Sequence, residues 1–196
     1  MDARRPHPVP TVKGDRLLGH SMRAPYRPAR ILVTGATGTL GRALWPSLAC
    51  FQAPIRILEH QTPVSRTLDR RAPEEGYPSS PAIEVVRGDL AHPRSLRGAV
   101  DGCDVVVHAA ARTGFGRLAR DAQRRINVEG TEALLAEAQS AGARVFVLIG
   151  YTGTVQERSD LGGPVDEETP PEGSYESDYV RMKFEAEALV LEANQA

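Results

Sequence analysis

The stretch Arg30-Ile-Leu-Val-Thr-Gly-Ala-Thr-Gly-Thr-Leu-Gly-Arg42 decides the fold of this chain. Its first part, Ile31–Thr34, is an apolar run rich in β-branched residues, which predicts a short buried strand. Gly35, Gly38 and Gly41 follow, and an apolar helical pattern comes after them. A strand, a glycine-rich turn and a helix in this order bring backbone N–H groups and a helix N-terminus to one point, where an anionic pyrophosphate can bind.

Each of the three glycines has its own physical reason in such a turn. Gly35 permits the tight turn, Gly38 lets the backbone approach the phosphates, and Gly41 lets the helix pack against the strand. A glycine triplet alone is a weak signal, and an ordinary glycine-rich turn is the alternative. The strand before it and the helix after it are what the dinucleotide-binding fingerprint requires.

The composition indicates a globular protein of one domain. The chain has 196 residues, of which 41% are apolar and 25% charged, as in ordinary soluble proteins. A net charge of −1 gives no reason to expect nucleic acid or a membrane as a partner, and no apolar run approaches the ~20 residues of a membrane span. Cys50 and Cys103 are too few for a disulfide framework, and reduced thiols in a cytoplasm fit best. Neither they nor the five histidines have the spacing of a metal site.

Residues 1–29 are expected to form a disordered arm, followed by one domain over residues 30–196. The arm contains five prolines, six Lys or Arg against two Asp, and no periodic apolar pattern. Such a segment cannot bury enough surface to offset its ordering entropy. It could be a basic targeting or binding tail, or an unstructured extension with the true start near Met22.

From Arg30 onward, predicted strands and helices alternate. The strands are expected at 30–34, 55–59, 83–87, 105–109 and 145–149, and the helices at about 40–50, 94–100, 118–141 and from 177 to the end. Pro46 should kink the first helix or delay its start. This alternation predicts an α/β fold with a doubly wound parallel sheet, whose ligands bind at the carboxyl ends of the strands.

Glu59 closes the second predicted strand, 24 residues after Gly35. A carboxylate near this position can accept hydrogen bonds from the adenosine ribose and repels a 2′-phosphate, which favours NAD over NADP. His60 beside it could tolerate a phosphate, so NADP is not excluded. A solvated glutamate at a strand end is the alternative.

Two further strand ends carry candidate residues. Asp89 follows the third strand and could accept a hydrogen bond from the adenine amino group, or could be a helix cap or turn residue. His108 and the small residues Ala109–Ala111 follow the fourth strand, where the backbone can pass close to a flat ligand. Close packing against a helix is the alternative for the alanines, and we expect His108 to be structural.

Tyr179 and Lys183 lie four residues apart on the last predicted helix, and therefore on one face. An ammonium group near a phenol favours the phenolate and should lower its pKa. Tyr179 could then exchange a proton with a substrate hydroxyl or carbonyl.

Taken together, these residues resemble the extended branch of the short-chain dehydrogenase/reductase superfamily, the NAD-dependent epimerase/dehydratase family, in its N-terminal portion. The resemblance covers Arg30 to the last residue, through the motifs Thr34-Gly-Ala-Thr-Gly-Thr-Leu-Gly41, Gly88-Asp-Leu90, His108-Ala-Ala-Ala111, Asn127-Val-Glu-Gly-Thr131, Pro164-Val-Asp-Glu-Glu-Thr-Pro170 and Tyr179-x-x-x-Lys183. It implies a Rossmann fold, an NAD(P) cofactor, a sugar-nucleotide or small hydroxyl or carbonyl substrate, and a possible homodimer.

The resemblance also implies roles for individual residues. Gly35, Gly38 and Gly41, with the backbone of Thr39 and Leu40, would bind the pyrophosphate; Asp89 and Leu90 would flank the adenine; Ala109, Ala110 and Ala111 would line the nucleotide's path; Lys183 would bind the nicotinamide ribose; and Tyr179 would be the catalytic acid/base.

Two departures from the family pattern matter. The family usually has a Ser or Thr just after the fifth strand, where this chain has Tyr151, and Thr152 or Thr154 could supply the hydroxyl. The chain also ends soon after Lys183, where relatives continue into a C-terminal substrate-binding region. We therefore expect the chain as given to be nearly inactive. A non-catalytic dinucleotide-binding protein is the alternative function, and a flavin- or nucleotide-binding module of another family is a weaker one.

Overall fold

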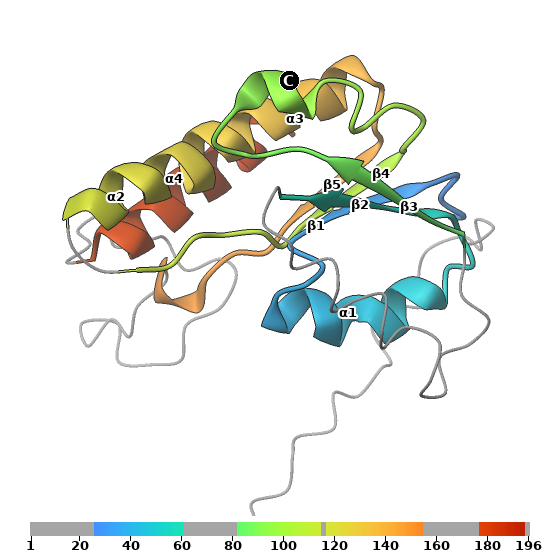
Figure 1. Ribbon diagram of the computed structural model, residues 1–196, viewed down its shortest axis with the longest axis horizontal. Helices are drawn as coiled ribbons and strands as arrows, with labels where there is room; N and C mark the ends of the chain where they lie inside the picture. Colours follow the sequence, from blue (N-terminus) through green and yellow to red (C-terminus); the bar gives the residue numbers. More distant parts are fainter. Residues whose placement is uncertain (1–25, 61–81, 115–116, 155–176, 195–196) are drawn as a thin grey trace, which may run out of the picture.

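Five parallel strands form the centre of the molecule (Figure 1). The computed structural model describes residues 26–60, 82–114, 117–154 and 177–194. The strands lie in the order β3-β2-β1-β4-β5 and are β1 (Ile31–Thr34), β2 (Ile55–Glu59), β3 (Ile83–Arg87), β4 (Val105–His108) and β5 (Val145–Leu148). Every neighbouring pair is parallel, which confirms the predicted doubly wound sheet.

Both faces of the sheet are apolar, because successive side chains of a strand point to opposite faces. One face packs against Trp45 of α1 (Thr39–Ala49), with Ile31, Val33, Ile55, Ile57, Val105 and Val107. Leu32 and Val106 point to the other face and pack with Leu134 of α3 (Gly130–Ser140). In Figure 1, α1 covers one face, while α2 (Arg117–Arg124), α3 and α4 (Asp178–Ala193) cover the other.

The strand order reverses beside β1, and the strands end at one edge of the sheet. Thr34 of β1 is in register with Leu58 of β2 and His108 of β4, which is itself in register with Leu148 of β5. The turns that follow these strands therefore meet at this edge. This is the place where ligands bind in open parallel sheets.

Two of the expected helices differ in detail. α1 begins at Thr39 and continues through Pro46 to Ala49, so the proline does not delay the start of the helix. The short helix expected at about 94–100 is only a 3₁₀ turn, η2 (Pro93–Leu96). The last helix, α4, starts directly after Ser177, as the sequence predicted.

The helix expected over 118–141 is present as an unbroken helical run over 117–140, but its centre is a π-helical turn, η3 (Arg125–Glu129), which lies between α2 and α3. The side chain of Asn127 in this turn bonds to the backbone of Arg112, 15 residues earlier. Gly130 follows, and a Cβ there would lie 2.7 Å from the carbonyl oxygen of Leu90. The wide turn thus satisfies contacts to distant segments, which helical periodicity cannot reveal.

Residues 26–29, the end of the expected arm, contact the domain. Tyr26 Oη donates to Asp104 Oδ2 at 2.6 Å, and the Ala29 N–H donates to Asp104 Oδ1 at 2.9 Å. The guanidinium of Arg144 lies over the Tyr26 ring, 4.9 Å from its centroid. The rest of the expected arm, residues 1–25, lies outside the described residues, as do the motif over 164–170 and most of the loop between β2 and β3.

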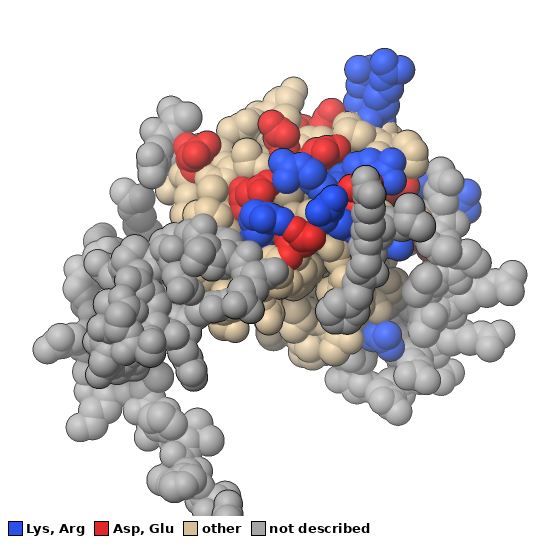
Figure 2. Space-filling model, turned by 90° about the vertical axis from the view of Figure 1, so that its left-hand side faces the viewer, with Lys and Arg blue, Asp and Glu red and all other residues tan. Residues whose placement is uncertain are grey.

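Ion pairs join α4 to its neighbour α2. Arg124 Nη1 lies 2.8 Å from Glu185 Oε2, and Arg120 Nη1 lies 3.9 Å from Asp178 Oδ2. Figure 2 shows basic and acidic side chains interspersed on the side of the molecule that lies to the left in Figure 1. Within the described ranges, no helix is both long enough and apolar enough to cross a bilayer.

Candidate functional site

The glycine turn after β1 is packed so closely that two of its positions require glycine. Gly35 has φ +68°, and a Cβ there would lie 2.6 Å from the backbone nitrogen of Ala110. A Cβ on Gly41 would overlap the carbonyl oxygen of Gly35 and lie 2.6 Å from Ala36 Cα. Gly38 differs, because the closest atom to its Cβ among the described residues would be the Gly35 carbonyl oxygen, at 3.2 Å. Among the described residues, packing within the turn therefore restricts position 38 less strictly than positions 35 and 41.

The N-terminus of α1 opens at this turn. Gly38 is the N-cap, and no side chain of the described residues caps it. Thr39 and Leu40 are exposed in the first turn of the helix. The first N–H groups of a helix have no partner within it, and together with the helix dipole they favour an anion. The turn can therefore hold a phosphate group on backbone N–H groups.

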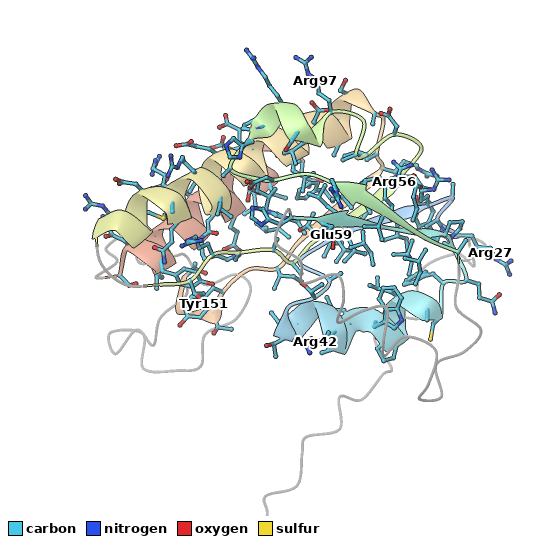
Figure 3. The ribbon with its side chains drawn as sticks, in the orientation of Figure 1. Arg27, Arg42, Arg56, Glu59, Arg97 and Tyr151 are labelled. Atoms are coloured by element: carbon cyan, nitrogen blue, oxygen red, sulfur yellow. The ribbon has the colours of Figure 1, made fainter. Side chains whose placement is uncertain are left out.

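Glu59, at the end of β2, has an oxygen without a hydrogen-bond partner among the described residues. Its Oε1 is one of two buried side-chain atoms in the described ranges that have no hydrogen-bond partner, the other being Trp45 Nε1. A buried acceptor without a donor costs free energy, so a ligand that supplies a hydroxyl donor is favoured there. The position of Glu59 in the fold is marked in Figure 3. This orphaned oxygen fits the ribose of a dinucleotide.

Asp89, after β3, is engaged by its own neighbours. Its Oδ1 accepts from the Ala91 N–H at 2.9 Å, and its Oδ2 lies 2.8 Å from His92 Nδ1 and 3.0 Å from His60 Nε2. Burial alone would raise the pKa of this carboxyl, but the hydrogen bonds from Ala91, His92 and His60 outweigh it and hold the pKa below its ordinary value. Asp89 is therefore a turn residue, one of the alternatives that the sequence left open. Its Oδ1 retains a lone pair that can accept a further hydrogen bond.

The loop after β4 lies against the glycine turn. The Ala109 N–H donates to the Thr34 carbonyl at 3.2 Å, and the Ala110 N–H donates to Thr34 Oγ1 at 3.2 Å. Next to them, His108 is 1% exposed, and burial, with Lys183 nearby, lowers its pKa to about 3. His108 is therefore neutral at pH 7 and holds hydrogen bonds rather than exchanging protons.

Tyr179 and Lys183 stand one turn apart on α4, next to the end of β5. Lys183 is 6% exposed, and its Nζ donates to the carbonyl oxygen of Ile149 at 2.5 Å. Burial lowers the pKa of this ammonium, while Glu187 opposes the shift. The backbone after β5 thus positions the lysine beside the tyrosine.

The expectation that Lys183 lowers the pKa of Tyr179 is wrong for this structure. Burial raises the pKa of the Tyr179 phenol, and the neighbouring phenol of Tyr151 raises it further. The ammonium of Lys183 is held by a backbone carbonyl instead. Tyr179 is therefore a protonated phenol at neutral pH, which is the state of a proton donor.

Tyr151, in the turn after β5, is the residue whose ring packs on Tyr179. The centroids are 5.6 Å apart and the ring planes are at 71°. The Tyr151 ring lies directly over Gly153, where a Cβ would overlap it. Thr152 opens the 3₁₀ turn η4 (Thr152–Thr154) and is exposed. Thr154 is buried, and its hydroxyl bonds to the Tyr151 carbonyl at 2.7 Å and reaches Glu187 Oε2 at 3.4 Å.

The sequence alone drew attention to Thr152 as the hydroxyl after β5 and treated Tyr151 as a departure. Among these residues, Tyr151, which is labelled in Figure 3, packs its ring against the ring of Tyr179. Thr34, Asn127 and Thr131 are further buried residues of this edge that sequence reasoning passed over. The one available signal was Asn127-Val-Glu-Gly-Thr131, a motif of the resemblance without an assigned role.

Three structural features of this edge fit a dinucleotide cofactor. The open helix N-terminus suits a pyrophosphate, the unpartnered Glu59 oxygen suits a ribose hydroxyl, and Lys183 is a buried donor beside the candidate acid Tyr179. No group of three metal-ligating side chains that could hold an ion occurs in the described part of the chain.

Comparison with known proteins agrees with this geometry. The profile of the NAD dependent epimerase/dehydratase family matches residues 31–196. The "4-hydroxy-2-methyl-3-oxo-4-farnesyl-3,4-dihydroquinoline-1-oxide ketoreductase" of Stigmatella aurantiaca is 32% identical over 166 residues, covering 84% of this chain and 46% of the relative. The "3 beta-hydroxysteroid dehydrogenase/Delta 5-->4-isomerase" of Mycobacterium tuberculosis is 32% identical over 171 residues, covering 84% and 43%.

A solved structure is similar over the same region. It is a short-chain dehydrogenase/reductase superfamily protein from Agrobacterium tumefaciens with bound NAD, with a TM-score of 0.65 and 29% identity over 85% of this chain and 45% of that one. The chain thus spans less than half the length of these relatives. The family match covers the whole of the chain beyond residue 30, and the chain belongs to the NAD dependent epimerase/dehydratase family.

Proposed function

We propose that this chain binds NAD(H) and that its natural protein is an oxidoreductase, in which hydride passes between the nicotinamide and a substrate carbon that bears a carbonyl or hydroxyl group. The observation that carries the proposal is the anchoring of Lys183 on the Ile149 carbonyl, one helical turn from Tyr179. This pair lies at the same sheet edge as the glycine turn. The residues proposed for proton exchange therefore lie at the same sheet edge as those proposed for cofactor binding.

Within this proposal each part of the edge has a task. Gly35, Gly38 and Gly41, with the N–H groups of Thr39 and Leu40, hold the pyrophosphate. Glu59 accepts from the adenosine ribose, and Asp89 with Leu90 flanks the adenine. Ala109, Ala110 and Ala111 line the nucleotide's path, and Lys183 donates to the nicotinamide ribose. The cofactor supplies the hydride chemistry, and the protein supplies orientation and the proton.

The protonation state of Tyr179 suits the reductive direction. Because burial raises the pKa of its phenol, the side chain carries its proton at neutral pH. As hydride reaches the carbonyl carbon, the carbonyl oxygen gains negative charge and takes the phenolic proton, which leaves a phenolate beside the Lys183 ammonium. Solvent then returns a proton to the phenolate. The oxidative direction reverses these steps and begins from the phenolate, so it should require higher pH.

A second hydroxyl should hold the substrate oxygen. Thr152 remains our sequence-based proposal, and the structure adds Tyr151, whose ring packs on Tyr179. Thr152→Val and Tyr151→Phe each remove a single hydroxyl group and keep the shape of the side chain. A loss of about 10²–10³ in kcat in one of them, with unchanged NADH affinity, identifies the donor.

The relatives guide the choice of substrates for testing. One is named a ketoreductase of a farnesylated dihydroquinoline oxide and another a hydroxysteroid dehydrogenase. We propose a ketone or secondary alcohol as the reacting group, on a small molecule that ranges from a sugar nucleotide to an apolar ring system. We further propose a cytoplasmic location, in line with the exposed free thiol of Cys50, and a possible homodimer.

The test has two stages. The 196-residue chain is titrated with NADH and NADPH, and cofactor fluorescence reports binding. The chain, and any longer natural form of it, is then assayed for NADH oxidation with a 3-ketosteroid, a β-keto ester and a 4-keto sugar nucleotide, beside the Tyr179→Phe variant. Failure of both cofactors to bind at millimolar concentration contradicts the proposal.

A non-catalytic dinucleotide-binding protein is the second candidate. Tyr151 in place of the usual Ser or Thr favours it. Tight NADH binding without turnover of any of these substrates would support this second function.

A further inference from the structure

A line of hydrogen bonds runs through the sheet edge beneath the candidate cofactor site. It begins at the Ala110 N–H, which donates to Thr34 Oγ1 at 3.2 Å. Thr34 Oγ1 lies 2.6 Å from His108 Nδ1, and His108 Nε2 lies 3.0 Å from Thr131 Oγ1. Thr131 Oγ1 ends the line by donating to the Asn127 carbonyl at 2.8 Å. All three side chains in the line are about 1% exposed, so water has little access to them.

The donors and acceptors available in this line fix which group donates in each hydrogen bond. A carbonyl oxygen can only accept, so Thr131 donates its one hydroxyl proton to the Asn127 carbonyl. Its oxygen must therefore accept a hydrogen bond from His108 Nε2. A neutral imidazole has one N–H, and this places it on Nε2 and leaves Nδ1 as an acceptor. Thr34 therefore donates to Nδ1 and accepts from the Ala110 N–H. Every group in the line is satisfied with His108 as the Nε2–H tautomer.

The surroundings of His108 agree with a neutral ring. Burial and the nearby Lys183 ammonium both lower its pKa. The ring of Phe146 from β5 packs against the imidazole edge-on, with centroids 6.1 Å apart. A charged imidazolium would carry an N–H donor on both ring nitrogens. The donor on Nδ1 would then face the hydroxyl proton that Thr34 directs at this nitrogen.

The line closes into a circuit through Asn127. The side chain of Asn127 accepts from the Arg112 N–H at 2.8 Å and donates to the Arg112 carbonyl at 2.9 Å. Both ends of the segment 110–112 are therefore tied to one residue, Ala110 through the histidine line and Arg112 directly. Gly35 packs against the Ala110 backbone on the other side.

We infer that His108 is a positioning residue for the backbone of residues 110–112. In its Nε2–H form it holds this backbone through hydrogen bonds with Thr34 and Thr131 and, beyond them, Asn127. The backbone is thereby kept at the distance from the glycine turn that a bound dinucleotide needs. This inference rests on the proposed cofactor binding. An apolar residue of similar size at position 108 would fill the space but would leave the Thr34 hydroxyl proton without its acceptor and Thr131 without the donor His108, and an unpaired polar group is costly in a buried site.

The first measurement is independent of any ligand. Nitrogen-15 histidine NMR of the 196-residue chain should show His108 as the Nε2–H tautomer, with a signal that stays constant between about pH 5 and 8, where exposed histidines titrate. His108→Gln identifies the signal by its loss. An Nδ1–H tautomer, or a ring that becomes charged in this range, overturns the inference.

The second measurement tests the link to the cofactor. Thr34→Val keeps the side-chain shape but leaves the Ala110 N–H and His108 Nδ1 unpaired, and it should raise the NADH dissociation constant about tenfold. Exchange of the Ala110 amide with deuterium should become faster in the same variant. Thr34→Ser restores the hydroxyl and should return both quantities to wild-type values, within about twofold. Ser47→Ala, which removes an exposed hydroxyl from α1, is the control.

Thr131→Val tests the other half of the circuit and replaces Thr34→Val if that variant does not fold. NADH affinity unchanged in a folded Thr34→Val or Thr131→Val variant overturns the inference. If the wild-type chain binds neither NADH nor NADPH, the proposed function fails and the cofactor role of His108 fails with it. The tautomer and the Ala110 exchange rate still decide whether the circuit exists.

Discussion

The ring of Tyr151 meets the ring of Tyr179 edge-on, with centroids 5.6 Å apart and ring planes at 71°. The contact joins the turn after β5 to the helix α4, which carries Lys183. Gly153 makes it possible, because any Cβ at that position would overlap the Tyr151 ring. The neighbouring Tyr151 phenol adds to the effect of burial and raises the pKa of Tyr179.

Tyr151→Phe should therefore lower the pKa of Tyr179. Tyr151 is one of two causes that raise this pKa, and burial, the larger cause, remains in the variant. The pKa should move toward 10.0, the ordinary value, without falling below it. Spectrophotometric titration of phenolate absorbance in the wild type, Tyr151→Phe and Tyr179→Phe measures the change. An unchanged Tyr179 titration would show that the two rings are not coupled.

Lys183 should make the folded chain more stable as pH rises. Burial lowers its pKa in the folded state below the ordinary 10.5. Between the two pKa values the unfolded chain binds more protons than the folded one, so the free energy of unfolding increases with pH. The gain is absent well below the folded pKa and is complete above the unfolded one.

Urea denaturation of the wild type and Lys183→Met at several pH values from neutral to 10.5 isolates this effect. The difference in unfolding free energy, wild type minus variant, should grow toward the alkaline end. A difference that stays constant, or that shrinks, would contradict the burial of the ammonium group.

Glu59 should make NADH the preferred cofactor. Its buried oxygen has no partner in the described part of the chain, and a 2′-phosphate near a carboxylate is repelled. Glu59→Gln keeps the shape and removes the charge, so NADPH affinity should improve relative to NADH affinity. Fluorescence titrations of both cofactors with both proteins measure the ratio. Tighter binding of NADPH than NADH by the wild type would be the opposite of this expectation.

Gly38 and Gly41 should respond differently to a methyl group. A Cβ at Gly38 would make a tight contact with the Gly35 oxygen at 3.2 Å, which a shift of a few tenths of an ångström relieves, whereas a Cβ at Gly41 would overlap that oxygen. Gly38→Ala should weaken NADH binding by at least about tenfold with a thermal midpoint near the wild-type value, because the clash is with the phosphates. Gly41→Ala should lose both binding and stability. Equal NADH affinity in Gly38→Ala and the wild type would place the pyrophosphate elsewhere.

Local sequence patterns were sufficient to predict the main strands and helices of this protein and the sheet edge where the candidate site lies. The apolar run Ile31–Thr34 and the glycines after it predicted β1, the turn and α1, because strand burial, tight turns and helix starts depend on residues close together in the chain. The same holds for Tyr179 and Lys183, which helical periodicity alone sets on one face of α4. The strand ends, and with them the edge that carries the candidate site, followed from the alternation of strands and helices.

What the sequence could not supply depends on contacts between distant segments. The π turn in the helix expected over 118–141 carries Asn127, which bonds to the distant Arg112, and the choice of His108 tautomer depends on Thr34 and Thr131 together. The pKa of Tyr179 moved opposite to the expected direction. Burial and a ring from the turn after β5 act on the phenol, while the Lys183 ammonium is held by the Ile149 carbonyl. Desolvation and hydrogen-bond direction are set by neighbours in space, and these become neighbours only when the chain folds.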